Sequence, residues 1–372
     1  MSRTFIQSGT ETVVKYPNAT HFAFVPAIFK ITKIPTEYDR LEMILTDRQT
    51  QNSYNEEREP LNGTAYFDIQ RYLQLLFSDV VHEVLDYSKD FIDSPLKKAA
   101  SVTIYWYRNG NQYYLGTFGI DAIWGAISAR ESSGGIMRRK WFVRYPFTVD
   151  VFAKNGTSFD VQVDGKWSDI MFYNHNEDAT GATPYHRYLL NPAKVIDTST
   201  VARTVHIAVP HSLILKNDEE AVGLVAYTLD IDRSTNGVYL RWIDRQGRYC
   251  YYLFKEIGGT TKVSAALTWE CRDTDVPAAY ENNVNIETST RQYLKQASTR
   301  SLGAKLVDSE TYDFLLTLVR SVVVDVFDGY NGDDAPQWHR VNIVPGSYER
   351  TTKHLQDFIF SIEEPAQNAQ TM

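Results

Sequence analysis

Residues 101–118, SVTIYWYRNGNQYYLGTF, are the stretch that most clearly predicts the fold. Asn109-Gly110 favours positive φ at both central turn positions, which is the geometry of a two-residue β-hairpin. The flanking β-branched and aromatic residues suit a half-buried pleated sheet. The turn predicts three facing pairs, Trp106 with Tyr113, Ile104 with Leu115 and Val102 with Thr117. Because side chains alternate across a strand, these pairs form an apolar face, and the opposite face carries Tyr105, Tyr107 and Tyr114.

The same turn signal recurs along the chain. Asn-Gly also occurs at 62–63, 155–156, 236–237 and 331–332, among segments rich in Val, Ile, Thr and aromatic residues. Residues 149–163 therefore predict a second hairpin, with Phe152 opposite Phe159. The pattern as a whole predicts a mainly β protein, all-β with a few short helices.

Residues 239–257, YLRWIDRQGRYCYYLFKEI, predict a hairpin of another kind. Asp244 and Gly247 suit a type I turn followed by a left-handed glycine, which is a G1 bulge. This register places Asp244 opposite Arg248 and makes one face apolar. The other face is semi-apolar and includes Arg241 in cation–π reach of Tyr251. That face is too apolar for water, so we expect another domain or another subunit to cover it.

Tyrosine and arginine are enriched at protein interfaces. The second faces of the two hairpins therefore supply the candidate interface residues, which are Tyr239, Arg241, Tyr249, Tyr251, Tyr105, Tyr107 and Tyr114.

Two helices interrupt the β pattern. In residues 68–77, Asp68 is the predicted N-cap, and Ile69, Leu73, Leu76 and Phe77 form one apolar stripe. In residues 309–320, Asp308 or Ser309 is the predicted cap, and a buried strand follows at 322–327. Each helix should pack one face on a sheet. The predicted architecture is therefore β-sandwich modules, each with a flanking helix.

The length of 372 residues allows at least two domains. The polar, proline-containing segment 191–203 is the predicted linker. We therefore expect an N-terminal β-rich region at 1–200 and a C-terminal β-sandwich at 201–372. Residues 281–301 are polar and long for a compact loop, which predicts an exposed excursion, an interaction arm or a partly disordered segment.

Composition argues against several classes of function. A net charge of −8 does not suit a nucleic-acid binder, which needs a basic surface to neutralise phosphates. No apolar run is long enough to span a membrane, and the first residues lack the apolar core of a secretory signal. Cys250 and Cys271 alone form neither a disulfide framework nor a zinc site.

Four polar segments are candidates for chemistry, and each has a simpler interpretation. His206 and His211 would point to opposite faces of a regular strand. The acidic segment 325–334 has ligands for a cation such as calcium but lacks the EF-hand spacing. Segment 174–188 suits the lining of a pocket or a long surface loop. Segment 127–147, the local basic cluster, suits a contact with an acidic partner or a nucleic-acid backbone, and more simply a subunit contact or a solvated surface. Nucleotide-loop, zinc-protease and serine-hydrolase motifs are missing. We therefore predict no catalytic residue, no metal ligand, no cofactor and no enzymatic activity.

Three stretches taken together, 62–77, 237–257 and 335–365, resemble a group of proteins encoded by bacteriophages and prophages of gut Bacteroidetes, usually among tail or baseplate genes. The resemblance implies a virion structural protein of the tail, made in the host bacterial cytoplasm, with no catalytic residues. It also implies the sandwich-plus-helix modules of tail-tube and distal tail proteins. Such a protein forms a closed homo-oligomeric ring around the DNA channel and docks neighbouring tail proteins.

Two other functions stay open from the residues. The content of 24 Tyr, 18 Phe and 7 Trp also suits a glycan-binding protein, because flat aromatic rings stack on sugar faces. The acidic segment 325–334 leaves a carbohydrate hydrolase as a third hypothesis, with the weakest support.

Overall fold

The computed structural model describes residues 3–78, 85–127, 131–132, 134–154, 156–167, 172–173, 185–197, 201–216, 219–269, 281, 290–351, 353–364 and 367–371. These residues form mostly β-strands, with two short α-helices among them, so the predicted all-β fold class is confirmed. They divide into two compact units. Unit 1 comprises residues 1–235 and 243–250, and unit 2 comprises residues 236–242 and 251–372.

This division differs from the predicted boundary between residues 200 and 201. Strand β13 (Ser158–Val163) pairs with β17 (Thr204–Lys216), so one sheet takes strands from both sides of that boundary. The segment expected to be a linker is anchored on both sides. Asn191 caps a short 3-10 turn at Pro192–Lys194, and the Arg203 and Thr204 amides donate to Asp164 Oδ1.

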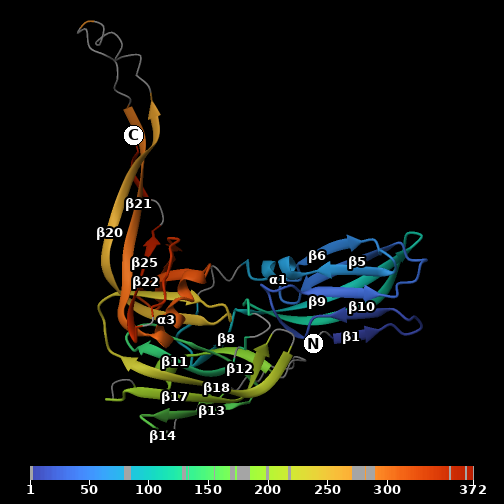
Figure 1. The fold of residues 1–372 in the computed structure, drawn as a ribbon, viewed down its shortest axis with the longest axis horizontal. Helices are drawn as coiled ribbons and strands as arrows, with labels where there is room; N and C mark the ends of the chain where they lie inside the picture. Colours follow the sequence, from blue (N-terminus) through green and yellow to red (C-terminus); the bar gives the residue numbers. More distant parts are fainter. Residues whose placement is uncertain are drawn as a thin grey trace. The chain divides into compact units, whose positions relative to one another are not determined.

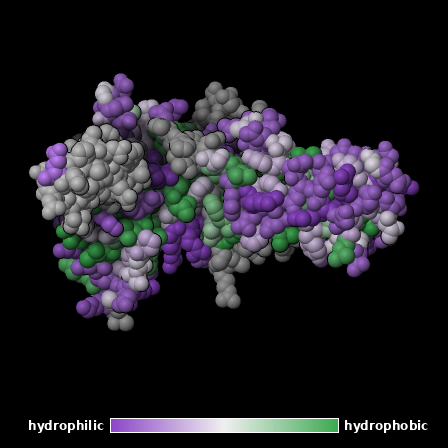
Figure 2. Space-filling view, turned by 90° about the horizontal axis from the view of Figure 1, so that it is seen from above, coloured by the Kyte–Doolittle hydropathy of each residue, from purple (hydrophilic) through white to green (hydrophobic). Residues whose placement is uncertain are grey.

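The N-terminal part of unit 1 is a β-sandwich (Figure 1). One sheet has the order β1 (Arg3–Ile6), β2 (Val13–Tyr16), β4 (Ile28–Thr32), β7 (Thr64–Asp68). The other has the order β3 (Thr20–Phe22), β10 (Asn111–Ile123), β9 (Lys97–Arg108), β5 (Arg40–Asp47), β6 (Ser53–Arg58). Phe118 of β10 contacts Phe5, Tyr16 and Phe29 of the facing sheet, with ring centroids 4.5–5.6 Å apart. The face of this sandwich that is seen in Figure 2 is largely hydrophilic.

The hairpin at 101–118 forms as β9 and β10, and Trp106 faces Tyr113 as predicted. Its register then shifts at a bulge between Tyr114 and Gly116. Ile104 therefore faces Gly116, and Val102 faces Phe118, in place of the predicted partners Leu115 and Thr117. The extra residue lets Leu115 and Phe118 both be buried, which a regular alternation from Tyr113 would not allow.

The remainder of unit 1 has two further sheets. One has the order β11 (Gly135–Phe142), β18 (Glu219–Asp232), β17, β13, β14 (Lys166–Trp167), with β15 (Phe172–Tyr173) paired to β13. The other has the order β12 (Val149–Lys154), β16 (Tyr185–Leu190), β8 (Phe91–Asp93).

The predicted hairpin at 149–163 is wrong. Its two strands join different sheets, because β12 pairs with β16 and β13 pairs with β17. A local turn does form, in which the Thr157 amide donates to the Lys154 carbonyl. That turn connects two packed sheets, and Phe152 and Phe159 do not face each other across a ladder.

Unit 2 is built on one large sheet. Its order is β23 (Pro336–Arg340), β22 (Val324–Tyr330), β19 (Val238–Ile243), β20 (Tyr249–Trp269), β21 (Thr290–Asp308), β25 (Leu355–Glu363), β24 (Asn342–Ile343), and β26 (Gln367–Thr371) also pairs with β21. Helix α3 (Ser309–Leu315) packs against this sheet through Phe314 on Trp242 and Tyr312 on Phe358. The strand predicted at 322–327 begins at Val324, after a 3-10 turn at Leu318–Arg320.

Both predicted helices form, and both are shorter than expected. Helix α3 spans Ser309–Leu315, and the predicted cap Asp308 accepts from the Thr311 amide at 2.7 Å. Helix α1 spans Gln70–Leu75, and its N-cap position is Ile69. Asp68 lies one residue too early to cap it. Its carboxylate accepts from the amides of Gln70 and Ala27 instead, which ties the helix entrance to the neighbouring chain. Within the described part of the chain, no helix is long and apolar enough to cross a membrane.

Candidate functional site

The predicted interface residues on the 239–257 hairpin are buried within this chain. Tyr239, Arg241, Tyr249 and Tyr251 each expose 7% or less of their surface. Tyr239 stacks beside Tyr251, with ring centroids 6.0 Å apart, and also lies beside Trp338 of β23. This face was expected to be covered by another domain or another subunit. It is buried within the chain, and Trp338 of β23 is one of the side chains that contact it.

Arg241 contacts two groups that the sequence pattern does not pair with it. Its guanidinium lies 4.4 Å from the Trp338 ring centroid, and Nη2 donates to Asp325 Oδ2 at 2.8 Å. Arg340 donates to the other oxygen of the same carboxylate at 2.6 Å. Asp328, the next acid along, pairs with His339. Asp325 and Asp328 are thus engaged by basic side chains of their own unit, and the described residues hold no cluster of three or more metal-ligating side chains.

The other predicted interface residues remain nearer the surface. Tyr114 is 56% exposed and lies edge-on to Tyr105 of the neighbouring strand. Tyr107 donates to Glu42, and its ring carries the Arg40 guanidinium at 4.2 Å. These three tyrosines lie on the outward faces of β9 and β10, and their role as an interface stays a prediction.

The remaining polar candidates are the two histidines, the basic cluster and segment 174–188. His206 hydrogen-bonds Thr228, and His211 lies at a bulge with φ of 57°. In the basic cluster, Arg138 and Lys140 of β11 form ion pairs with Asp230 and Asp232 of β18. Residues 174–184, together with Cys271, lie outside the described residues.

The turn at residues 243–250 has the predicted geometry. The Asp244 amide donates to the Arg248 carbonyl, the Gly247 amide donates to the Asp244 carbonyl, and Gly247 has φ of 70°. The Asp244 carboxylate adds two bonds to the Gln246 and Arg248 amides and an ion pair to the Arg248 guanidinium. The confirmed feature is therefore a type I turn with a G1 bulge.

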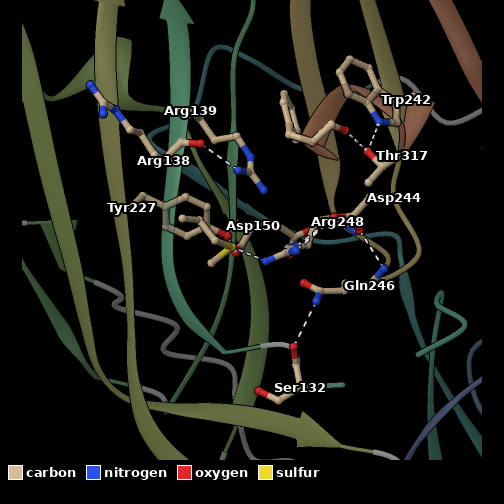
Figure 3. A network of polar contacts seen from close by, with 12 residues as sticks. Ser132, Arg138, Arg139, Asp150, Tyr227, Trp242, Asp244, Gln246, Arg248 and Thr317 are labelled. Atoms are coloured by element: carbon tan, nitrogen blue, oxygen red, sulfur yellow. Dashed lines mark hydrogen bonds and ion pairs between the residues drawn. The ribbon is translucent and has the colours of Figure 1, made fainter. Parts of the chain in front are cut away.

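This turn is fixed within unit 1 by its backbone and side chains (Figure 3). The Ala126 amide donates to the Arg245 carbonyl, and Arg245 Nη2 donates to the Ala126 carbonyl. Gln246 Nε2 donates to the Ser132 carbonyl at 3.0 Å. A Cβ on Gly247 would lie 1.4 Å from the Trp124 carbonyl oxygen, so only glycine fits here.

A buried ion pair lies in the same region. Asp150 of β12 and Arg187 of β16 form a bidentate pair with both N–O distances at 2.7 Å, and their side chains are 1% and 0% exposed. Arg187 also donates to the Leu96 carbonyl, and the Tyr227 hydroxyl donates to the Asp150 carbonyl. Burial raises the pKa of Asp150 to about 6, although Arg187 acts to lower it. Sequence reasoning missed this pair because its members are 37 residues apart and join two strands whose pairing was not predicted.

These buried groups have the character of a structural network. Burial raises the pKa of the Cys250 thiol, which keeps it protonated and a poor nucleophile. The carboxylates of Asp150 and Asp244 are engaged by arginines, so neither is a free general base.

An arm of unit 2 stands out by its exposure. The outer parts of β20 and β21 pair with each other from Gly259–Arg300 to Trp269–Thr290 (Figure 1). Strand β25 pairs with β21 only from Thr299 onward, and β26 pairs with it at residues 293–296. On β20, every residue from Lys255 to Val263 is exposed, including Ile257 at 45% and Val263 at 55%. The second half of the polar segment 281–301 thus forms a strand from Thr290, and residues 282–289 lie outside the described residues.

Unit 1 also contains a cavity of about 480 Å³. Its charged lining residues are Arg3, Arg48, Lys97, Asp121 and Glu220. Its apolar wall includes Phe152, Tyr185, Leu213 and Val222. Lys97 pairs with Asp121 at 3.2 Å, and Glu220 accepts from the Thr20 amide at 2.9 Å.

Comparison with known proteins gives little. No family model and no curated protein matches the chain. One solved structure concerns host cell surface retention of a 1.5-MDa bacterial ice-binding adhesin. Its chain is 10% identical in sequence to this one, the alignment covers 90% of this chain and 96% of that chain, and the TM-score is 0.19. A structure of the N-terminal four Ig domains of Dscam1 isoform 6.44 is 6% identical in sequence. The alignment covers 96% of this chain and 92% of that chain, and the TM-score is 0.18. At such scores neither fold nor function can be transferred.

Proposed function

We propose that this chain is a structural assembly protein of a bacteriophage tail or baseplate, which associates through the β20–β21 arm. The observation that carries the assembly role is the exposure of both faces of β20 between Lys255 and Val263. A strand at the edge of a folded core normally buries alternate side chains. Along this stretch β21 also pairs with β25 and β26, but a small sheet needs a packed apolar face to be stable in water, so a partner surface should cover this one.

The tail location rests on the sequence resemblance of segments 62–77, 237–257 and 335–365. The preferred partner is another copy of the chain, because an arm that docks on a different surface of the next copy makes a heterologous contact, which closes into a ring when the rotation allows. Neighbouring tail proteins are further partners in this proposal. The engagement of Asp325 and Asp328 by basic side chains favours this role over a hydrolase that uses those acids.

Removal of the arm tests the proposal. Thr260 and Thr299 face each other in the ladder, so residues 261–298 can be replaced by Asn-Gly, which closes a two-residue hairpin. We expect the full chain to sediment as an oligomer at micromolar concentration and the arm-deleted chain to sediment as a folded monomer. A full chain that stays monomeric, and is absent from purified virions on imaging, would contradict the proposal.

A matched pair of point variants separates the arm from general surface effects. Val263→Asp places a charge on the arm, and Ile6→Asp places one on β1, at residues that are 55% and 64% exposed. We expect Val263→Asp to weaken association by at least about tenfold, and Ile6→Asp to leave it unchanged, because a charge buried at an interface without a partner costs more than one in water. Equal effects of the two variants would remove the arm from the contact.

A further inference from the structure

We propose that the cavity in unit 1 binds an acidic sugar, that is, a monosaccharide unit with a carboxylate. The inference is independent of the assembly role, because the cavity residues all belong to unit 1 and the arm belongs to unit 2. Its volume of about 480 Å³ lies within the range of small-molecule sites in proteins.

The charge of the cavity favours an anion. Of the five charged residues that line it, Lys97 and Asp121 form a pair, and Arg3 and Arg48 outnumber the remaining carboxylate, that of Glu220. Within the described part of the chain, the guanidinium groups of Arg3 and Arg48 have no acidic partner and no hydrogen-bond acceptor. Guanidinium groups bind carboxylates through paired, charge-assisted hydrogen bonds. Two such groups at one cavity of an otherwise acidic protein therefore favour an anionic ligand.

The other charged groups at the cavity suit hydroxyl groups on the ligand. Asp121 is 8% exposed, and Lys97 Nζ lies 3.2 Å from its Oδ2, so these two charges compensate each other. Glu220 uses one carboxylate oxygen to accept from the Thr20 amide, and its carboxylate can accept further hydrogen bonds from ligand hydroxyls.

The apolar wall accounts for the ring of the ligand. Phe152 and Tyr185 line the cavity from neighbouring strands β12 and β16. Aromatic side chains pack on the C–H faces of sugar rings, which combine apolar area with polar edges. A carboxylate, hydroxyl groups and a ring with an apolar face occur together in hexuronic and related acidic sugars.

Gly119 positions one of the two arginines. A Cβ at Gly119 would lie 2.7 Å from Arg48 Nη2, so the absence of a side chain leaves the space that this guanidinium occupies. The backbone of Gly119 is not in the left-handed region, and alanine is therefore tolerated by its conformation. Gly119→Ala thus displaces the Arg48 guanidinium without removing its charge.

Titration calorimetry on the full chain tests the site with glucuronate, glucose and inorganic phosphate at one ionic strength. We expect glucuronate to bind at millimolar or lower concentration, and glucose and phosphate to bind at least about tenfold more weakly, as the loss of one charge-assisted contact or of the ring would cause. Absence of glucuronate binding would overturn the proposal. Phosphate binding as tight as that of glucuronate would overturn the sugar class.

Three variants assign the binding to this cavity. Arg48→Ala should weaken glucuronate binding about tenfold, and Gly119→Ala should weaken it in the same direction. Arg144→Ala is the matched control, because Arg144 is exposed in unit 1 and does not line the cavity. Unchanged thermal unfolding shows that each variant is folded. Binding that survives Arg48→Ala, or that falls equally in Arg144→Ala, would overturn the assignment.

Discussion

At the scale of single residues, Asp150 and Arg187 show what a buried charge requires. Both are almost completely withdrawn from water, and each satisfies the other through two bonds. The attraction within such a pair is offset by the cost of removing both charges from water. The pair therefore adds little net stability as a unit, but the loss of one member leaves the other without compensation.

A double-mutant cycle checks this reasoning. Asp150→Leu and Arg187→Met should each lower the free energy of unfolding by about 3–5 kcal/mol, because the partner that remains is buried without an opposite charge. The double variant should be more stable than either single variant, although it loses the bond to the Leu96 carbonyl. Urea unfolding of the unchanged chain, the two single variants and the double variant measures these values. Strict additivity of the single changes would show that the two residues do not act as a unit.

Gly247 provides a second prediction at this scale. Gly247→Ala combines a strained φ of 70° with a Cβ placed 1.4 Å from the Trp124 carbonyl oxygen. We expect a loss of more than about 3 kcal/mol in unfolding free energy. Gly110→Ala is the matched control, because its φ is 78° but no atom lies within 4 Å of its Cβ, so only the backbone cost of about 1 kcal/mol applies. Similar losses for both variants, measured by urea unfolding, would exclude the steric clash as the cause.

At the scale of elements, local signals were more informative than long-range ones. The Asn109-Gly110 and Asp244–Gly247 turns could be predicted, because turn geometry depends on residues that are adjacent in sequence. The same reasoning failed at 149–163, where the turn forms but its strands enter different sheets. Strand partners depend on the whole core, and residues such as Phe152 and Phe159 carry no local mark of which sheet they join.

Sites that are formed by residues from several strands could not be predicted from local sequence patterns. The cavity brings Arg3, Arg48 and Asp121 together from β1, the turn after β5 and β10. Nothing in the sequence spacing of these residues indicates that they meet. The face that carries Tyr239 and Tyr251 is a similar case, because its apolar character predicts that it is covered, but the sequence does not indicate that Trp338 of β23 contributes to the cover.

At the scale of the whole molecule, the chain passes between its two units at residues 235/236, 242/243 and 250/251. Compositional boundaries such as 191–203 do not mark these positions. The reason is physical, since the crossing lies within a hairpin whose turn belongs to unit 1 and whose flanking strands belong largely to unit 2. A linker-based division could not predict that arrangement.

The net charge of −8 gives the last prediction, which concerns assembly. Identical subunits with this charge repel one another, and salt screens that repulsion, because the Debye length falls from about 30 Å at 0.01 M to about 8 Å at 0.15 M. If association takes place through apolar contacts of the arm, such as that of Val263, the oligomeric fraction should rise across this range of salt concentration. The arm-deleted chain should remain monomeric throughout. Sedimentation velocity at fixed protein concentration measures both, and an oligomeric fraction that falls with salt would show that ion pairs, rather than apolar contacts, hold the subunits together.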